Sequence, residues 1–146
     1  DIMEAVRSPM SYSSEAEGRE KPEHEPESVG RQRDAYYAIL ARLEARREPI
    51  ANLMSRRYRM AAWFGREAET PFPVLHEAIA KVRTAASLLV QWSGQDVARI
   101  NRDLWRRMEG DIWWGASDPD PIDAKIKEAI AAAEAICRPA LEGRIR

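Results

Sequence analysis

The sequence predicts an all-α fold, an antiparallel helical bundle, on three observations. From Phe72 to Leu89, apolar residues recur at alternating steps of three and four, and only a helix places such a heptad seam on one face. A helix with one apolar stripe needs partners, and the other long segments carry similar stripes. The connections between them are short, which favours antiparallel neighbours. We therefore expect one long kinked helix at about 29–67 and three shorter helices at about 71–92, 94–114 and 120–142.

The long helix at about 29–67 contains an interior proline. Pro49 removes one backbone hydrogen bond and its ring clashes with the preceding turn. Either the helix kinks at Pro49, or it breaks there and Pro49 opens a new helix. We favour the kink, because Leu43, Ile50 and Arg57 keep a seven-residue step through it.

The three shorter helices have recognisable starts. Thr70 is expected as the N-cap of the helix at 71–92, with Pro71 at its first position. Ser93 and Asp96 match a capping box for the next helix. Asp120 is the expected N-cap of the last one. Residues in the middle of the stripes predict a core that contains Leu43, Ile79, Val82, Leu89, Leu104 and Ile130.

Length and charge predict one helical domain preceded by a different kind of segment. The chain has 146 residues, enough for one domain with a substantial core. Residues 1–30 hold three basic and eight acidic groups, whereas residues 31–115 hold fifteen basic and ten acidic groups. The first stretch is also rich in Ser, Pro and Glu. We expect residues 1–28 to be an acidic, disordered or extended segment that is dispensable for folding, and residues 29–146 to form the bundle domain.

The residues needed for several chemistries are missing or scattered. The two histidines, His24 and His76, do not fall into a metal-binding spacing, and the seven glycines form no phosphate-cradling loop. The single cysteine, Cys137, is expected to be a buried inert thiol, because no neighbouring base would activate it. We therefore predict no catalytic residues, no metal site, no cofactor and no enzyme activity.

Aromatic doublets are the first candidate functional feature. Adjacent residues on a helix lie about 100° apart, so both members of a pair such as Trp113 and Trp114 cannot occupy the centre of one stripe. Broad burial among several neighbouring helices is the competing interpretation. Exposed Trp and Tyr residues near Arg are typical of interface centres. The candidate interface residues are Tyr36, Tyr37, Leu40, Trp63, Trp113 and Trp114.

Two groups of arginines with interleaved aromatics are the second candidate. Arginine beside an aromatic ring can hold phosphate and stack on a base. The competing interpretation is a solvated surface whose arginines pair with nearby carboxylates. The candidate anion or nucleic-acid contacts are Arg56, Arg57, Arg59, Arg102 and Arg106.

Two stretches, residues 59–68 followed by Pro71 and Phe72, and residues 135–141, resemble segments of uncharacterised bacterial all-helical proteins. The similarity covers residues 35–142. Some of those proteins carry a membrane helix upstream of the all-helical part. The resemblance implies an all-helical fold and brings no assigned activity.

The expected function is a non-enzymatic helical interaction or assembly module in a bacterial cytoplasm. Self-association as a homodimer, or binding to another protein, is the expected partnership. A nucleic-acid-binding regulator is the alternative, and peripheral contact with a membrane is also open. No apolar run of this chain approaches the length needed to span a bilayer, and a membrane tether upstream of residue 1 stays an open alternative.

Overall fold

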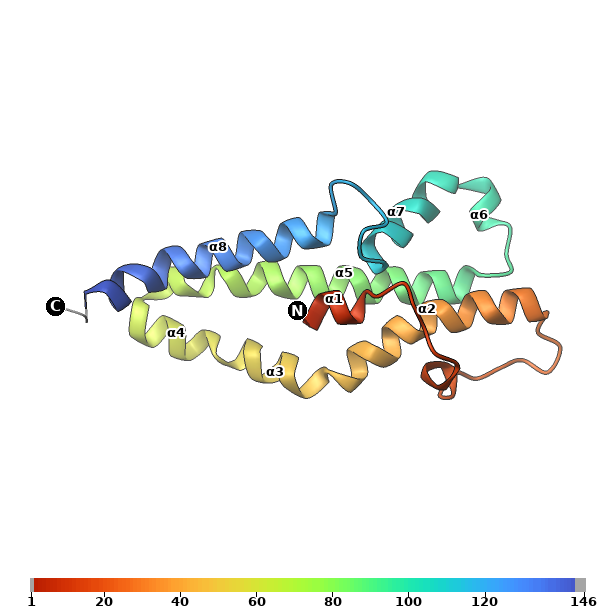
Figure 1. Ribbon diagram of the computed structural model, residues 1–146, viewed down its shortest axis with the longest axis horizontal. Helices are drawn as coiled ribbons and strands as arrows, with labels where there is room; N and C mark the ends of the chain where they lie inside the picture. Colours follow the sequence, from red (N-terminus) through yellow and green to blue (C-terminus); the bar gives the residue numbers. More distant parts are fainter. Residues whose placement is uncertain (1, 144–146) are drawn as a thin grey trace. The chain divides into compact units, whose positions relative to one another are not determined.

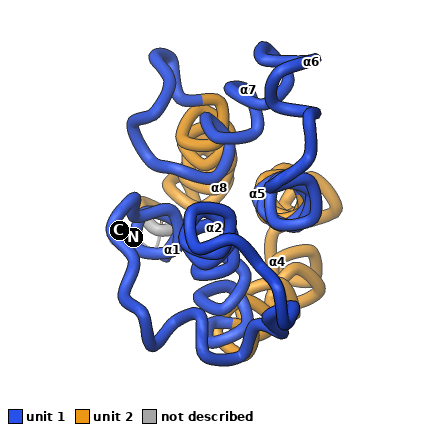
Figure 2. Tube along the Cα trace, turned by 90° about the vertical axis from the view of Figure 1, so that its right-hand side faces the viewer, with its two compact units in different colours: residues 1–46, 81–120 blue, residues 47–80, 121–146 orange. Residues whose placement is uncertain are grey.

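The computed structural model describes residues 2–143, and that part of the chain is all-α, without a strand (Figure 1). The expected fold class is confirmed. The chain divides into two compact units (Figure 2). Unit 1 comprises residues 1–46 and 81–120, and unit 2 comprises residues 47–80 and 121–146. The units therefore do not separate at residue 28, where composition placed a boundary.

Unit 1 contains the chain's first helices, the later half of one long helix, and two shorter ones. Its elements are α1 (Ile2–Val6), the 3-10 helix η1 (Ser13–Ala16), α2 (Glu27–Ala45), the later half of α5 (Pro71–Trp92), α6 (Val97–Ile100) and α7 (Arg102–Ile112). α2 and the later half of α5 run in opposite directions (Figure 1). Their buried apolar residues include Ile39, Leu43, Val82 and Leu89.

Unit 2 contains two short helices, a helical turn, the first half of α5 and the last helix. Its elements are α3 (Arg47–Ser55), α4 (Arg57–Phe64), the 3-10 helix η2 (Arg66–Glu69), the first half of α5, and α8 (Pro121–Glu142). Buried residues of this unit include Phe72, Ile122 and Ile126. An ion pair joins α8 to α5, with Lys125 Nζ at 2.9 Å from Glu77 Oε1.

The single long helix predicted at 29–67 is instead three helices, α2, α3 and α4. The chain leaves helical geometry at Arg46, with φ −107° and ψ 13°, and α3 begins at Arg47. Pro49 therefore falls in the first turn of α3, where its missing N–H needs no partner. The kink that we favoured is wrong, and the break relieves the clash a proline makes inside a helix. Gly65, with φ 87°, ends α4.

The helix predicted at 94–114 is also interrupted. Asn101 lies between α6 and α7, and its side chain accepts a hydrogen bond from the Leu104 N–H at 3.1 Å. The expected capping box at Ser93 does not form, because the Ser93 hydroxyl is buried and donates to the Leu89 carbonyl at 2.6 Å. Thr70 has αR backbone angles and is the C-cap of η2, and its hydroxyl donates to the Glu67 carbonyl at 2.8 Å instead of capping α5.

The helices at 71–92 and 120–142 match α5 and α8 closely. Leu43, Val82 and Leu89 are buried as predicted, while Ile79 and Leu104 are half-buried. Ile130 is 50% exposed, so its place in the core is wrong. The buried stripe of α8 runs through Ile126 and Ala129, and Ile130 lies about 100° away from Ala129 around the helix.

Candidate interaction surfaces

The predicted interface residues separate into buried and exposed groups. Tyr36 is 1% exposed, so its proposed role as an accessible anchor is wrong. Its ring lies 6.1 Å from that of Trp105 and 5.3 Å from that of Trp113, centre to centre. Tyr36 also donates a 2.6 Å hydrogen bond to Glu109 Oε1. Burial raises the pKa of the Tyr36 hydroxyl, and the neighbouring Glu109 carboxylate raises it further. This aromatic cluster belongs to the interior of unit 1.

Tyr37 and Leu40 line a hollow of about 300 Å³, whose lining includes none of the rings of this cluster. They are half-buried, and the hollow also includes Arg83 and Ser87 of α5. All of these residues belong to unit 1. The hollow therefore follows the packing of α2 against the later half of α5, and its two candidate residues are only partly accessible.

Trp63 and Trp114 are the exposed members of the aromatic pairs. Trp114 is 50% exposed in unit 1, and its backbone N–H donates to the Arg7 carbonyl at 2.8 Å. Trp63 is 72% exposed in unit 2, with its ring edge-on to Phe64 at 6.4 Å between centres. The expectation that one member of each doublet lies outside the core therefore describes Trp63 and Trp114 correctly.

Helices α3 and α4, which carry Trp63, share an unusual property: neither contains a buried residue. Their side chains are nevertheless apolar at many positions. Leu53 is 42% exposed and Tyr58 is 65% exposed, in addition to Trp63. We call residues 47–64 the α3–α4 surface. Large exposed apolar side chains on one segment mark an interaction surface more often than singly scattered ones do.

The predicted anion contacts lie in both units. Arg56 and Arg59 on the α3–α4 surface are exposed. Arg57 is half-buried, with its guanidinium 4.6 Å from the Tyr58 ring centre and its Nε 4.0 Å from Glu69 Oε2. Arg57 therefore already contacts neighbours within unit 2, in contrast to Arg56 and Arg59.

Arg102 and Arg106 of α7 are exposed and lie in a hollow of about 660 Å³ in unit 1. The hollow is lined by Ala98, Arg99, Arg102, Trp105, Arg106 and Glu109. Trp105 is only 7% exposed, because its ring packs against Tyr36. The sequence therefore placed these arginines beside an aromatic residue correctly, but that ring is covered and offers no open face for stacking on a base.

Several buried polar interactions of unit 1 involve the N-terminal segment, which we expected to be disordered or extended. Arg7 is 1% exposed and lies at the C-terminal end of α7. Its Nε donates to the Asp111 carbonyl at 2.9 Å, and its Nη2 donates to the Gly110 carbonyl at 2.9 Å. The same Nη2 lies 2.9 Å from Asp120 Oδ2. The last carbonyls of a helix lack intrahelical donors and form the negative end of its dipole, so a cation satisfies both requirements there.

A second arginine holds the residues after α1. The guanidinium of Arg42, on α2, donates to both carboxylate oxygens of Glu15, at 2.6 and 2.8 Å. It also donates to the carbonyls of Ser8 at 2.7 Å and Val6 at 3.2 Å. The hydrogen bond from Arg42 holds the pKa of Glu15 below its ordinary value. One side chain of α2 therefore contacts the backbone at Val6 and Ser8 and the carboxylate of Glu15, on the two sides of an irregular stretch.

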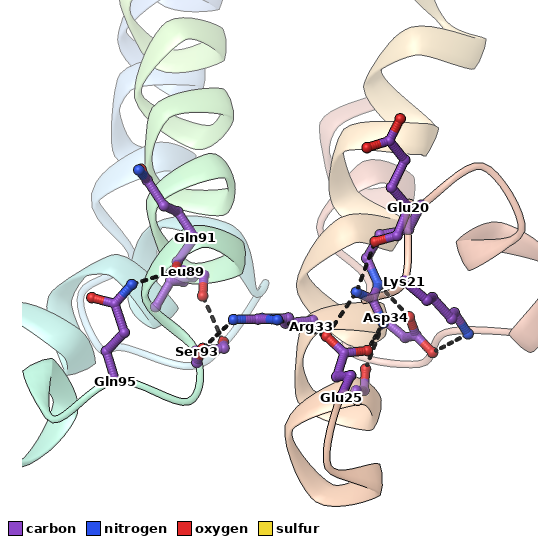
Figure 3. A network of polar contacts seen from close by, with 11 residues as sticks. Glu20, Lys21, Glu25, Arg33, Asp34, Leu89, Gln91, Ser93 and Gln95 are labelled. Atoms are coloured by element: carbon purple, nitrogen blue, oxygen red, sulfur yellow. Dashed lines mark hydrogen bonds and ion pairs between the residues drawn. The ribbon is translucent and has the colours of Figure 1, made fainter. Parts of the chain in front are cut away.

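A third network holds residues 19–25 against α2 and the end of α5. Arg19 donates to Glu25 Oε2 and to Asp34 Oδ1, each at 2.6 Å. Arg33 donates to Glu25 Oε1 at 2.7 Å and to the Ser93 carbonyl at 2.7 Å, and Figure 3 shows it lying between these two acceptors. The hydrogen bond from Arg19 is the main reason that the pKa of Glu25 falls to about 2.

These contacts correct the expectation of a disordered or extended segment over residues 1–28. Its α1 and η1 both contact α2, and Met3, Val6 and Ala16 are buried. The composition pointed to solvated charges, but Arg7 and Arg19 are buried with carboxylate and carbonyl acceptors. A sequence signal did exist: a few apolar residues, among them Met3 and Val6, precede the acidic stretch.

The remaining residues considered for chemistry lie apart. His24 and His76 are both exposed, and Cys137 is half-buried rather than buried. Within residues 2–143, no group of three or more His, Cys, Asp or Glu side chains is arranged to hold a metal ion. No helix in the same part of the chain is long and apolar enough to cross a membrane.

Comparison of the chain with known protein families, with curated proteins and with solved structures gives no match. The features of the described residues that suggest a function are the α3–α4 surface of unit 2 and the arginine-lined hollow of unit 1.

Proposed function

We propose that this protein is a non-enzymatic helical assembly module and that two copies associate through the α3–α4 surface. The observation that carries the proposal is that α3 and α4 bury no residue of their own, although Leu53, Tyr58 and Trp63 are large and apolar. Covering such side chains removes apolar area from water, which stabilises the contact by about 25 cal/mol per Å² of apolar area buried. Trp and Tyr are also the residue types that most often anchor interfaces.

A second copy of this chain is the occupant that we propose for these side chains. Leu53 lies on α3, whereas Tyr58 and Trp63 lie on α4, so both helices would contribute to the contact. Two-fold dimers need only one self-complementary surface, and they are the commonest closed oligomers.

The charges on the α3–α4 surface predict how association depends on salt. Exposed Arg56 and Arg59 have no ion-pair partner within residues 2–143. Two copies that meet through this surface bring like charges together, and added salt screens their repulsion. Self-association should therefore strengthen as ionic strength rises. If the same arginines instead bound an acidic protein or nucleic acid, that binding would weaken as ionic strength rises.

The experiment is light scattering of the purified chain over a hundredfold dilution range, at low and at high salt. We expect a dimer mass at the highest concentration and a shift toward dimer in high salt. Trp63→Ser should weaken association by about 2 kcal/mol, the loss typical of a central aromatic anchor. Trp114→Ser is the matched control, because it removes an exposed tryptophan from unit 1. A monomer mass at every concentration, or equal losses in both variants, would refute the proposal.

The alternative function, a nucleic-acid-binding regulator that uses both arginine groups, has less support. Arg57 is held by Tyr58 and Glu69, and the Trp105 ring is covered. Stacking platforms for bases are therefore reduced to Trp63 and its neighbours. An oligonucleotide that bound through Trp63, and whose affinity fell steeply with salt, would favour this alternative.

A further inference from the structure

The arginine-lined hollow of unit 1 carries an inference that is independent of the α3–α4 surface. Arg99 of α6 and Arg102 and Arg106 of α7 line one hollow of about 660 Å³. That volume lies within the range of small-molecule sites. Three of its six lining residues are arginines, and Glu109 is the one acidic residue among them.

The acidic residue of the lining already forms a hydrogen bond with a buried residue of unit 1. Glu109 is half-buried, and its Oε1 accepts the 2.6 Å hydrogen bond from the Tyr36 hydroxyl. Glu109 has no ion pair with an arginine of the hollow within residues 2–143. Among the described residues, the ion pair of Arg99 is long and exposed, with Nε 3.5 Å from Asp96 Oδ1.

Arg102 and Arg106 have no ion-pair partner in the described part of the chain, and their positions are electrostatically unfavourable. They are four residues apart on one helix, where like charges repel. Arg102 also occupies the first turn of α7, at the positive end of the helix dipole, where a cation is disfavoured. Asp103 lies three residues before Arg106, but the two do not form an ion pair. Internal contacts therefore leave this positive charge uncompensated.

We propose that this hollow binds phosphate groups, with Arg102 and Arg106 as the principal contacts and Arg99 as a third. Guanidinium groups match phosphate oxygens with paired N–H donors. A ligand with several phosphates would neutralise the repulsion between the arginines and the unfavourable dipole contact at the same time. The phosphates come either from a small polyphosphorylated molecule or from a nucleic-acid backbone.

The experiment is calorimetric titration of the full chain with inorganic triphosphate, and separately with a short DNA duplex, at about 50 and about 200 mM salt. We expect binding of triphosphate, with an affinity that Arg106→Gln lowers about tenfold, as expected for one charge-assisted hydrogen bond. Arg102→Gln should act similarly. Tighter binding of the duplex, with a steeper salt dependence, would identify the backbone as the source of phosphate, and preference for triphosphate would identify a small molecule.

Arg107→Gln is the matched control, since Arg107 is exposed on the same helix but does not line the hollow. It removes the same charge and should leave the affinity unchanged. Arg106→Lys keeps the charge, and its affinity for triphosphate should lie between that of the parent and that of Arg106→Gln. Circular dichroism checks that each variant is folded. The proposal would be overturned if Arg106→Gln and Arg107→Gln weakened binding equally, or if sulfate competed for the hollow as well as triphosphate does. It would also be overturned if neither probe bound.

Discussion

Buried arginine is the feature of this protein that matters most at the scale of single residues. Arg7, Arg19 and Arg42 are each at most 9% exposed, and each donates to several acceptors. A buried charge is tolerated only when it is paired and its donors are satisfied. The planar guanidinium, with five N–H donors, can do this where a lysine could not.

The first prediction concerns acid. The pKa of Glu25 falls from 4.5 to about 2 in the folded chain, mainly through the hydrogen bond from Arg19. Because the folded pKa is the lower one, this contribution is fully present above pH 4.5 and is lost as pH falls toward about 2. The pKa of Asp34 is also lowered: burial raises it, but the hydrogen bonds from Arg19 and Lys21 outweigh burial.

Urea unfolding at a series of pH values measures this loss. The free energy of unfolding should drop across that window, and Glu25→Gln should give a shallower drop, because the variant has no carboxylate to protonate at that position. Glu23→Gln is the control, since Glu23 is exposed and outside the network. Parallel pH curves for the parent and Glu25→Gln would contradict the prediction.

At the scale of elements, the burial of an apolar side chain, rather than its presence in the sequence, decides how much it contributes to the free energy of unfolding. α5 keeps its predicted bounds, and its Val82 and Leu89 are both 0% exposed. α8 also keeps its bounds, yet Ile130 is half exposed. A stripe read from the sequence leaves its lateral position uncertain by about one residue, which is 100° around the helix.

The second prediction compares these helices. Val82→Ala or Leu89→Ala should lower the free energy of unfolding by about 1–4 kcal/mol, through lost transfer energy and the cavity left behind. Ile130→Ala should cost well under that, because half of the side chain is already in water. Thermal denaturation of the three variants measures the difference. A larger shift for Ile130→Ala than for Leu89→Ala would mean that α8 is rotated from its described position.

At the scale of the whole molecule, the N-terminal segment is part of the structure of unit 1 rather than an appendage. It supplies buried Met3 and Val6 and a cation at the end of α7. Folding of this segment costs conformational entropy. Hydrogen bonds from the side chains of Arg7, Arg19 and Arg42 offset that cost, and apolar burial offsets only part of it.

The third prediction is that the segment is needed for full stability. Deleting residues 1–20 should lower the melting temperature by several degrees, because the deletion exposes apolar area on α2 and leaves buried acceptors without donors. Arg7→Met should reproduce part of the loss while keeping the chain length unchanged. Arg31→Met is the control, since the Arg31 side chain is 75% exposed. An unchanged midpoint in the deletion variant would restore the earlier expectation of a dispensable segment.

The sequence by itself determined the all-α class, the bounds of α5 and α8, and three of the six proposed core positions, because apolar periodicity and proline starts are local signals. It also singled out Trp63, Arg102 and Arg106, which are exposed in the structure. Only the tertiary structure showed that Tyr36 is buried, that the long helix breaks at Arg46, and that Arg7 is held by α7. The burial of Tyr36 and the position of Arg7 depend on partners far away in the chain, Glu109 for Tyr36 and Gly110 for Arg7. Local pattern carries no information about which distant carbonyl or ring will satisfy a given side chain.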